Sequence, residues 1–127
     1  MFELGIIEEF EAAHALGPDF GPASRLHGHT YRVEIIIRGH ALDASGTLYP
    51  LDHLQDVTRT LLGTLHYQHL NALPAFQSVN STVEQVCSYV HRELASALDR
   101  ARLDSLRVTV WESPRVFASL DAALTPA

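Results

Sequence analysis

Three histidines in the first quarter of the chain have the spacing of a metal site. His27 and His29 are separated only by Gly28. In an extended backbone, side chains two residues apart point to the same face, so the two imidazoles can converge, and the glycine allows a close backbone approach. His14, on a neighbouring strand, would add a third nitrogen. Three imidazoles leave the fourth tetrahedral position of zinc open, which is typical of a catalytic zinc.

Two strands must position these histidines. Residues 2–14 are predicted to form the first strand, and the Gly/Pro-containing residues 17–25 form a loop. Residues 27–39 alternate strongly and are predicted to form the second strand. Antiparallel pairing of the two strands would bring His14 close to the other two histidines. The metal-binding face continues into an apolar face, formed by His27, His29, Tyr31, Val33, Ile35 and Ile37.

The middle of the chain predicts two helices. Apolar residues between Leu54 and Leu65 follow helical spacing, with Asp52 as the expected N-cap. Residues 81–84 read Ser-Thr-Val-Glu, which predicts a capping box at the start of the second helix. The buried stripe of that helix is predicted to comprise Val83, Val86, Cys87, Val90, Leu94, Ala97 and Leu98.

Residues 106–112 and 116–120 are predicted to form two closing strands around a turn at Pro114. The resulting order is two strands, two helices and two strands. It favours a single α+β domain over residues 1–127, with a four-stranded antiparallel sheet and both helices on one face.

Composition limits the classes of partner. The chain has 127 residues, a formal net charge of −6 and no basic run, which argues against nucleic-acid binding. No apolar run is long enough to span a bilayer, and the start of the chain lacks the basic region of a signal peptide. With Cys87 as the only cysteine, an intrachain disulfide is impossible. We therefore expect a cytoplasmic protein without membrane or nucleic-acid partners.

Several motifs resemble the 6-pyruvoyltetrahydropterin synthase family, which includes the 6-carboxytetrahydropterin synthases. The first is Phe-Glu-Ala-Ala-His at residues 10–14, followed by His-Gly-His at 27–29 and Tyr31. Leu65, together with Leu-Asn at residues 70–71, is similar to the first and last residues of the family's Leu-Asp-His-x-x-Leu-Asn motif. Further similar motifs are Asn-Ser-Thr-Val-Glu at residues 80–84 and Val-Trp-Glu-Ser at 110–113.

The resemblance implies a tunnelling fold, a zinc cofactor held by His14, His27 and His29, and a pterin substrate. It also implies a homo-oligomer, usually a hexamer built as a dimer of trimers, with active sites at subunit interfaces. Glu112 is implied to hold the pterin, whose 2-amino and N3–H groups one carboxylate can accept in bidentate fashion. Thr82 and Glu84 match positions near the pterin, although Glu84 equally suits the capping box. The resemblance therefore implies that the substrate-binding residues are Glu112, Thr82 and Glu84.

The chain lacks the residues that the family uses for proton transfer. The family cysteine, four residues before His-Gly-His, is replaced by Ala23, and its Asp-His pair falls on His66 and Tyr67. A Leu-Asp-His sequence at residues 51–53 precedes the first helix instead of following it, so it is interpreted as a helix cap. A family Asp-Phe pair that precedes this helix falls on residues 50–51, or on 52–53 if the loop is shifted.

The segment after the first helix offers replacements for these groups. His66 or His69 could act as a base, because an imidazole titrates near neutral pH, and Tyr67 could donate or relay a proton. A polar helix end without catalytic function would have the same composition. Cys87 is expected on a buried stripe, so no thiolate mechanism is predicted.

Three functions fit these residues. The first is a zinc-dependent carbon–oxygen or carbon–carbon lyase acting on 7,8-dihydroneopterin triphosphate or a related pterin. The second is a zinc- and pterin-binding protein that no longer turns over, as Ala23, His66 and Tyr67 suggest. The third is a zinc hydratase or hydrolase of another kind, since three histidines and a water also suit hydration chemistry.

Overall fold

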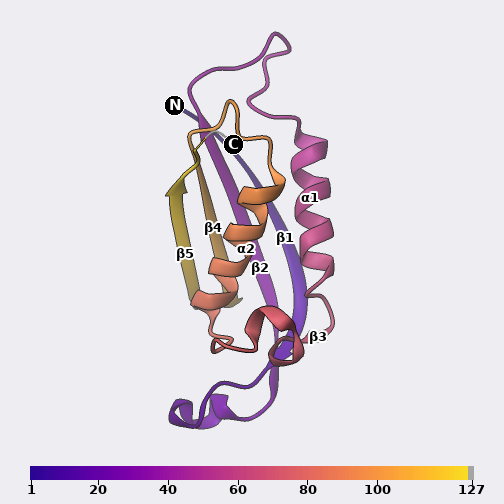
Figure 1. The fold of residues 1–127 in the computed structure, drawn as a ribbon, viewed down its shortest axis with the longest axis vertical. Helices are drawn as coiled ribbons and strands as arrows, with labels where there is room; N and C mark the ends of the chain where they lie inside the picture. The colour runs from indigo at the N-terminus through magenta and orange to yellow at the C-terminus, as the bar shows by residue number, and fades with distance from the viewer. Residues whose placement is uncertain (126–127) are drawn as a thin grey trace.

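A long antiparallel hairpin runs through the centre of the molecule (Figure 1). The computed structural model describes residues 1–125, and its first two strands are β1 (Phe2–His14) and β2 (His27–Gly39). They pair without a break from Phe2 opposite Gly39 to His14 opposite His27. Both strands have the predicted bounds, because a strict two-residue alternation buries one face of each and leaves the other in solvent.

Within residues 1–125 the sheet has five strands, in the order β3-β1-β2-β4-β5. Strands β4 (Ser105–Ser113) and β5 (Val116–Ala123) continue it antiparallel beyond β2, whereas β3 (Gln68–His69) pairs parallel to β1. The prediction of a four-stranded, purely antiparallel sheet in the order ββααββ is therefore wrong. A two-residue strand is too short to show any periodicity, and β3 exists only because the chain leaving the first helix meets the edge of β1.

Two α-helices, α1 (Leu51–Gly63) and α2 (Val83–Ala97), pack on one face of the sheet, α2 across its middle and α1 beside β1 (Figure 1). In the described part of the chain, neither is long and apolar enough to cross a membrane. Three short 3-10 helices complete the structure: η1 (Pro18–Ser24), η2 (Leu70–Ala72) and η3 (Pro74–Phe76).

Both helix starts differ from their predictions. The N-cap of α1 is Pro50, without a side-chain hydrogen bond, whereas Asp52 lies in the first turn. The N-cap of α2 is Thr82, whose hydroxyl accepts a hydrogen bond from the backbone N–H of Gln85 at 3.2 Å. The capping residues therefore lie one position later than predicted, because Ser81 is drawn into the core by a contact described below.

The core joins the inner face of the sheet to the helices. The predicted stripe of α2 is buried except for Ala97, which is exposed. His91 is also buried on this helix, and its Nε2–H donates to the carbonyl of Leu106 at 3.0 Å. The thiol of Cys87 donates to the carbonyl of Val108, and burial raises its pKa to about 11.

Candidate metal and substrate site

The hairpin register brings the three histidines together at one end of the sheet. His14 lies directly opposite His27, and Ala12 lies opposite His29, so all three imidazoles share the inner face. The ring centroids are 4.5 Å apart for His14 and His27, 5.1 Å for His14 and His29, and 4.8 Å for His27 and His29. The rings meet at 63–88°, so they converge edge to face instead of stacking.

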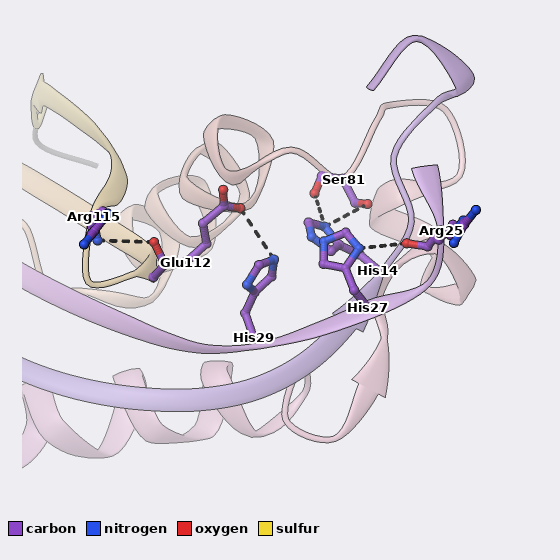
Figure 2. A network of polar contacts seen from close by, with 8 residues as sticks. His14, Arg25, His27, His29, Ser81, Glu112 and Arg115 are labelled. Carbon is purple, nitrogen blue, oxygen red and sulfur yellow. Dashed lines mark hydrogen bonds and ion pairs between the residues drawn. The ribbon is translucent and has the colours of Figure 1, made fainter. Parts of the chain in front are cut away.

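Backbone carbonyls fix the tautomers of two of these rings. The Nδ1 atom of His14 lies 2.7 Å from the carbonyl oxygen of Ser81, and Nδ1 of His27 lies 2.7 Å from that of Arg25 (Figure 2). A carbonyl oxygen can only accept, so Nδ1 must carry the proton in both rings. The Nε2 lone pairs are therefore free, which is how proteins orient histidine ligands towards a metal.

The unpaired nitrogens fit a metal ion. Nε2 of His14 and Nε2 of His29 are both buried and have no hydrogen-bond partner in the described residues. One ring nitrogen from each of the three histidines lies within 4.8 Å of the other two. Zinc holds imidazole nitrogens at about 2.0–2.1 Å, so small side-chain rotations would bring all three to one ion. An ion here would relieve the cost of burying unpaired polar atoms.

The electrostatics favour the neutral form of His14 and His29, the form in which an imidazole binds a metal. Burial lowers the pKa of His14 more than its hydrogen bond to the Ser81 carbonyl raises it, and the neighbouring histidines lower it further. Burial also lowers the pKa of His29, against an opposing effect of the Glu112 carboxylate. Both rings therefore offer a lone pair at neutral pH.

Glu112 lies at the carboxyl end of β4, beside the three imidazoles. Its Oε2 atom is 3.9 Å from Nε2 of His29, and its side chain is 23% exposed (Figure 2). A carboxylate in this position can accept hydrogen bonds from a ligand that also reaches the metal position. The structure thus brings the predicted substrate-binding Glu112 to the predicted metal-binding residues, although 83 positions separate it from His29 in the sequence.

The other two predicted substrate-binding residues lie at the start of α2. Thr82 is partly buried and its hydroxyl caps the helix, whereas Glu84 is exposed. The prediction that Glu84 is the third residue of a capping box is wrong, because Gln85 takes that position. Their contact with a substrate stays a prediction.

The segment after α1 places His66, Tyr67 and His69 beside the hairpin. Nδ1 of His66 accepts a hydrogen bond from the backbone N–H of Glu11 at 3.0 Å, so that lone pair is already engaged. The ring of His66 stacks on Tyr67 at 3.9 Å, and Tyr67 is 76% exposed with a left-handed backbone (φ 58°). A non-glycine residue in that conformation is strained, which is common at functional sites.

His69 pairs with Ala13 of β1, the residue before the candidate ligand His14. It lies close enough to His14 for its charge to lower the pKa of that residue. Tyr67 and His69 also line a cavity of about 590 Å³ that reaches Gly28 and His29. A Cβ on Gly28 would lie 3.6 Å from the carbonyl of Ala12, an ordinary contact, so the close approach expected there is not required within this chain.

Sequence reasoning missed three groups at the site. The carbonyls of Ser81 and Arg25, which orient two imidazoles, carry no side-chain signal that could have identified them. The third is Tyr31, which is fully buried two residues after His29 and whose hydroxyl has no hydrogen-bond partner in the described residues. Burial, then the charge of Glu112, raises the pKa of Tyr31. Its place on the histidine face was the available signal.

Fold and site together define an α+β protein with a candidate three-histidine metal centre and a carboxylate beside it. The family model described as 6-pyruvoyl tetrahydropterin synthase matches residues 3–123, and the chain belongs to this family. The resemblance noted from the motifs is thereby confirmed.

Relatives agree with this assignment. The chain is 30% identical, over 94% of its length and 89% of the relative's, to a Pyrococcus abyssi protein named provisionally as a 6-carboxy-5,6,7,8-tetrahydropterin synthase. The structure of the Caenorhabditis elegans 6-pyruvoyl tetrahydropterin synthase matches with a TM-score of 0.88 at 25% identity, covering 95% of both chains. A Plasmodium vivax 6-pyruvoyltetrahydropterin synthase shares the fold, with a TM-score of 0.79 at 19% identity, covering 96% of this chain and 98% of that one.

Proposed function

We propose that this protein is a zinc-dependent lyase that processes 7,8-dihydroneopterin triphosphate or a related pterin. The observation that carries the proposal is the convergence of three imidazoles beside a carboxylate that lies 3.9 Å from one of them. The two groups suit the two ends of one substrate, a polar ring and an oxygen-bearing side chain. Membership of a tetrahydropterin synthase family supports this choice over a hydratase or hydrolase.

Glu112 would bind the ring end. A pterin presents its 2-amino group and N3–H as two parallel donors, which one carboxylate accepts through a bidentate pair of hydrogen bonds. Because the carboxylate is only partly exposed, this pairing would be stronger than at an open surface. Binding at Glu112 directs the substituent of the ring towards the imidazoles.

His14, His27 and His29 would hold the metal, and the donor set fits zinc. Bound zinc would act as a Lewis acid on side-chain oxygens of the substrate and offset negative charge that develops there. The three neutral imidazoles contribute no charge of their own, so the ion keeps its full positive charge.

Ala23, at the position of the family cysteine, has no titratable group. Another residue must therefore accept the proton. We propose His69 for this role, since it pairs with Ala13, beside His14, and lines the cavity that reaches His29. Tyr67 is exposed at the same cavity and could relay a proton. His66 would first have to release the N–H of Glu11 from its Nδ1.

The test is to incubate the zinc-loaded protein with 7,8-dihydroneopterin triphosphate and to follow products by mass spectrometry. We expect loss of triphosphate or cleavage of the side chain. His69→Gln should slow conversion while zinc content stays constant, and His40→Gln, an exposed histidine at the far end of β2, is the matched control. Absence of pterin binding together with absence of conversion would overturn the proposal.

A silent paralogue that binds zinc and pterin is the second candidate. Ala23 at the family cysteine position and the engaged Nδ1 of His66 favour it. It predicts pterin binding without product, and no effect on binding when His66, Tyr67 and His69 are replaced together. Product formation by the unmodified protein would exclude it.

The proposed assembly is a homo-oligomer, a hexamer formed as a dimer of trimers. Only two residues of β3 pair with the outer edge of β1, and β5 is an edge strand at the other end of the sheet. Exposed apolar side chains lie on β1 (Ile7) and on β5 (Val116, Phe117 and Leu120). Unpaired edges of this kind are templates for pairing with another chain.

A further inference from the structure

Tyr31 is buried, and its packing gives no reason for a tyrosine instead of a phenylalanine at this position. Its ring stacks on Phe10 with 4.7 Å between centroids and 9° between planes, and the residue is fully buried. Phenylalanine would fill the same space and make the same stack. The hydroxyl, by contrast, has no hydrogen-bond partner in residues 1–125, and burying an unpaired hydroxyl costs free energy.

The surroundings of Tyr31 are those of the candidate site. It follows His29 by two residues on the inner face of β2, and its ring lies edge-on to His29 at 5.4 Å and to His14 at 6.1 Å between centroids. The antiparallel pairing of β2 with β4 ends at Arg32 opposite Trp111, so the next residues along the two strands, Tyr31 and Glu112, lie across from each other. The Tyr31 ring therefore lies beside His14 and His29, in the neighbourhood of the Glu112 carboxylate that lies 3.9 Å from Nε2 of His29.

Three unsatisfied polar groups converge here in total. They are Nε2 of His14, Nε2 of His29 and the hydroxyl of Tyr31, all buried and without partners in the described part of the chain. The two nitrogens are acceptors that a metal would satisfy. A phenol is a hydrogen-bond donor at neutral pH, so it needs an oxygen acceptor that is not supplied by the protein.

We propose that the hydroxyl of Tyr31 donates a hydrogen bond to a side-chain oxygen of the pterin bound between the metal and Glu112. The inference rests on the proposed function and assigns to Tyr31 the positioning of the reactive side chain, as distinct from the ring. The ligand must therefore carry a hydroxyl or carbonyl group on its substituent. The same pterin without a substituent makes no use of Tyr31.

The experiment compares two probes, 7,8-dihydroneopterin with its hydroxylated side chain and 7,8-dihydropterin without one, on the zinc-loaded full-length protein. In Tyr31→Phe we expect affinity for 7,8-dihydroneopterin to fall by roughly three- to tenfold, the effect of one hydrogen bond, and affinity for 7,8-dihydropterin to stay constant. Zinc content should not change. The melting temperature should be unchanged or higher, because an unpaired buried hydroxyl is removed.

Tyr49 provides the matched control. It is also buried, but its hydroxyl donates to Nδ1 of His53 at 2.6 Å and accepts from the N–H of Asp99 at 3.2 Å, near the carboxyl end of α2 and far from the site. Tyr49→Phe should lower the melting temperature and leave the affinity for both probes unchanged.

The outcomes separate the two proposals. Equal affinity of Tyr31→Phe and unmodified protein for 7,8-dihydroneopterin would overturn the role of Tyr31 and leave the proposed function intact. So would an equal loss for both probes accompanied by a lower melting temperature, which is the behaviour of a structural residue. Failure of the unmodified protein to bind either probe would overturn the proposed function, and the role of Tyr31 with it.

Discussion

At the scale of single residues, the site is defined by which polar atoms are already paired. Carbonyl oxygens hold Nδ1 of His14 and Nδ1 of His27, which leaves the opposite nitrogen of each ring free. Nε2 of His29 is buried without a hydrogen-bond partner, and its nearest charged atom is Oε2 of Glu112 at 3.9 Å. The predictions about metal and ligand binding at this site are based on these pairings.

Removing one imidazole should remove the metal. His27→Ala is expected to reduce zinc from about one ion per chain to a small fraction of that, because two ligands hold zinc far more weakly than three. The measurement is elemental analysis after dialysis. His40→Ala, an exposed histidine paired with Asp104, should keep full occupancy. Full zinc occupancy in His27→Ala would contradict the assigned centre.

Replacing the carboxylate should affect the ligand and not the metal. Glu112→Gln retains the shape of the side chain but presents an amide, which cannot accept both pterin donors. We expect pterin affinity to fall by about ten- to a hundredfold, as for charge-assisted hydrogen bonds, with unchanged zinc content. A fluorescence titration with 7,8-dihydroneopterin measures this, and an unaltered dissociation constant would exclude Glu112 as the anchor.

At the scale of elements, helix α2 connects the stability of the fold with the site. Its N-cap Thr82 follows directly after Ser81, whose carbonyl orients His14. Its buried face carries Cys87 against β4. The start of the helix therefore contacts His14, a candidate metal ligand, and its middle contacts the sheet.

Loss of the N-cap should destabilise the protein. Thr82→Ala removes the acceptor for the N–H of Gln85 and is expected to lower the free energy of unfolding by about 1 kcal/mol, whereas Thr82→Ser should cost much less. Urea denaturation followed by circular dichroism measures both variants. An equal loss for alanine and serine would show that the cap contributes little.

The buried thiol should make stability depend on pH in alkaline solution. The pKa of Cys87 is about 11 in the folded chain and its ordinary value is 9.0, so the unfolded chain loses this proton first as the pH rises. The contribution of the thiol is therefore complete below pH 9 and is lost between pH 9 and pH 11. Urea unfolding across this range measures the effect, and Cys87→Ala should show a smaller decline. The same slope in both proteins would contradict the assignment.

At the scale of the whole molecule, the sheet ends in two edges that the chain itself does not fully cover. The candidate site lies near η1 and β3, at the end of the molecule opposite both termini (Figure 1). Tyr67, a proposed relay group, is 76% exposed there. A neighbouring subunit could cover this surface, which agrees with the assembly we propose.

A charge on an exposed edge strand should disrupt the proposed assembly. Leu120→Lys adds a charge to the exposed edge strand β5 and is expected to shift the protein from a hexamer to smaller species, since lysine on an edge opposes pairing. Leu51→Lys, at an exposed position on α1, is the control and should leave the mass unchanged. Sedimentation velocity measures both, and a monomeric unmodified protein would exclude the assembly.

Local periodicity in the sequence was enough to predict the two long strands, the two helices and most of their buried residues. Two-residue alternation defined β1 and β2 and put the three histidines on one face, because a one-residue slip in register would turn the apolar face of a strand towards solvent. Helical spacing identified α1 and α2 and most of their buried residues. The motifs identified the family, which the match over residues 3–123 confirmed.

Only the tertiary structure decided the contacts between distant segments. It added the parallel strand β3, moved the cap of α2 from Ser81 to Thr82, buried His91, and left the hydroxyl of Tyr31 unpaired beside Glu112. Each of these depends on how one element lies against another. The contacts of backbone carbonyls and of residues at the ends of loops do not depend on a side-chain pattern. The local sequence therefore does not predict which groups they contact.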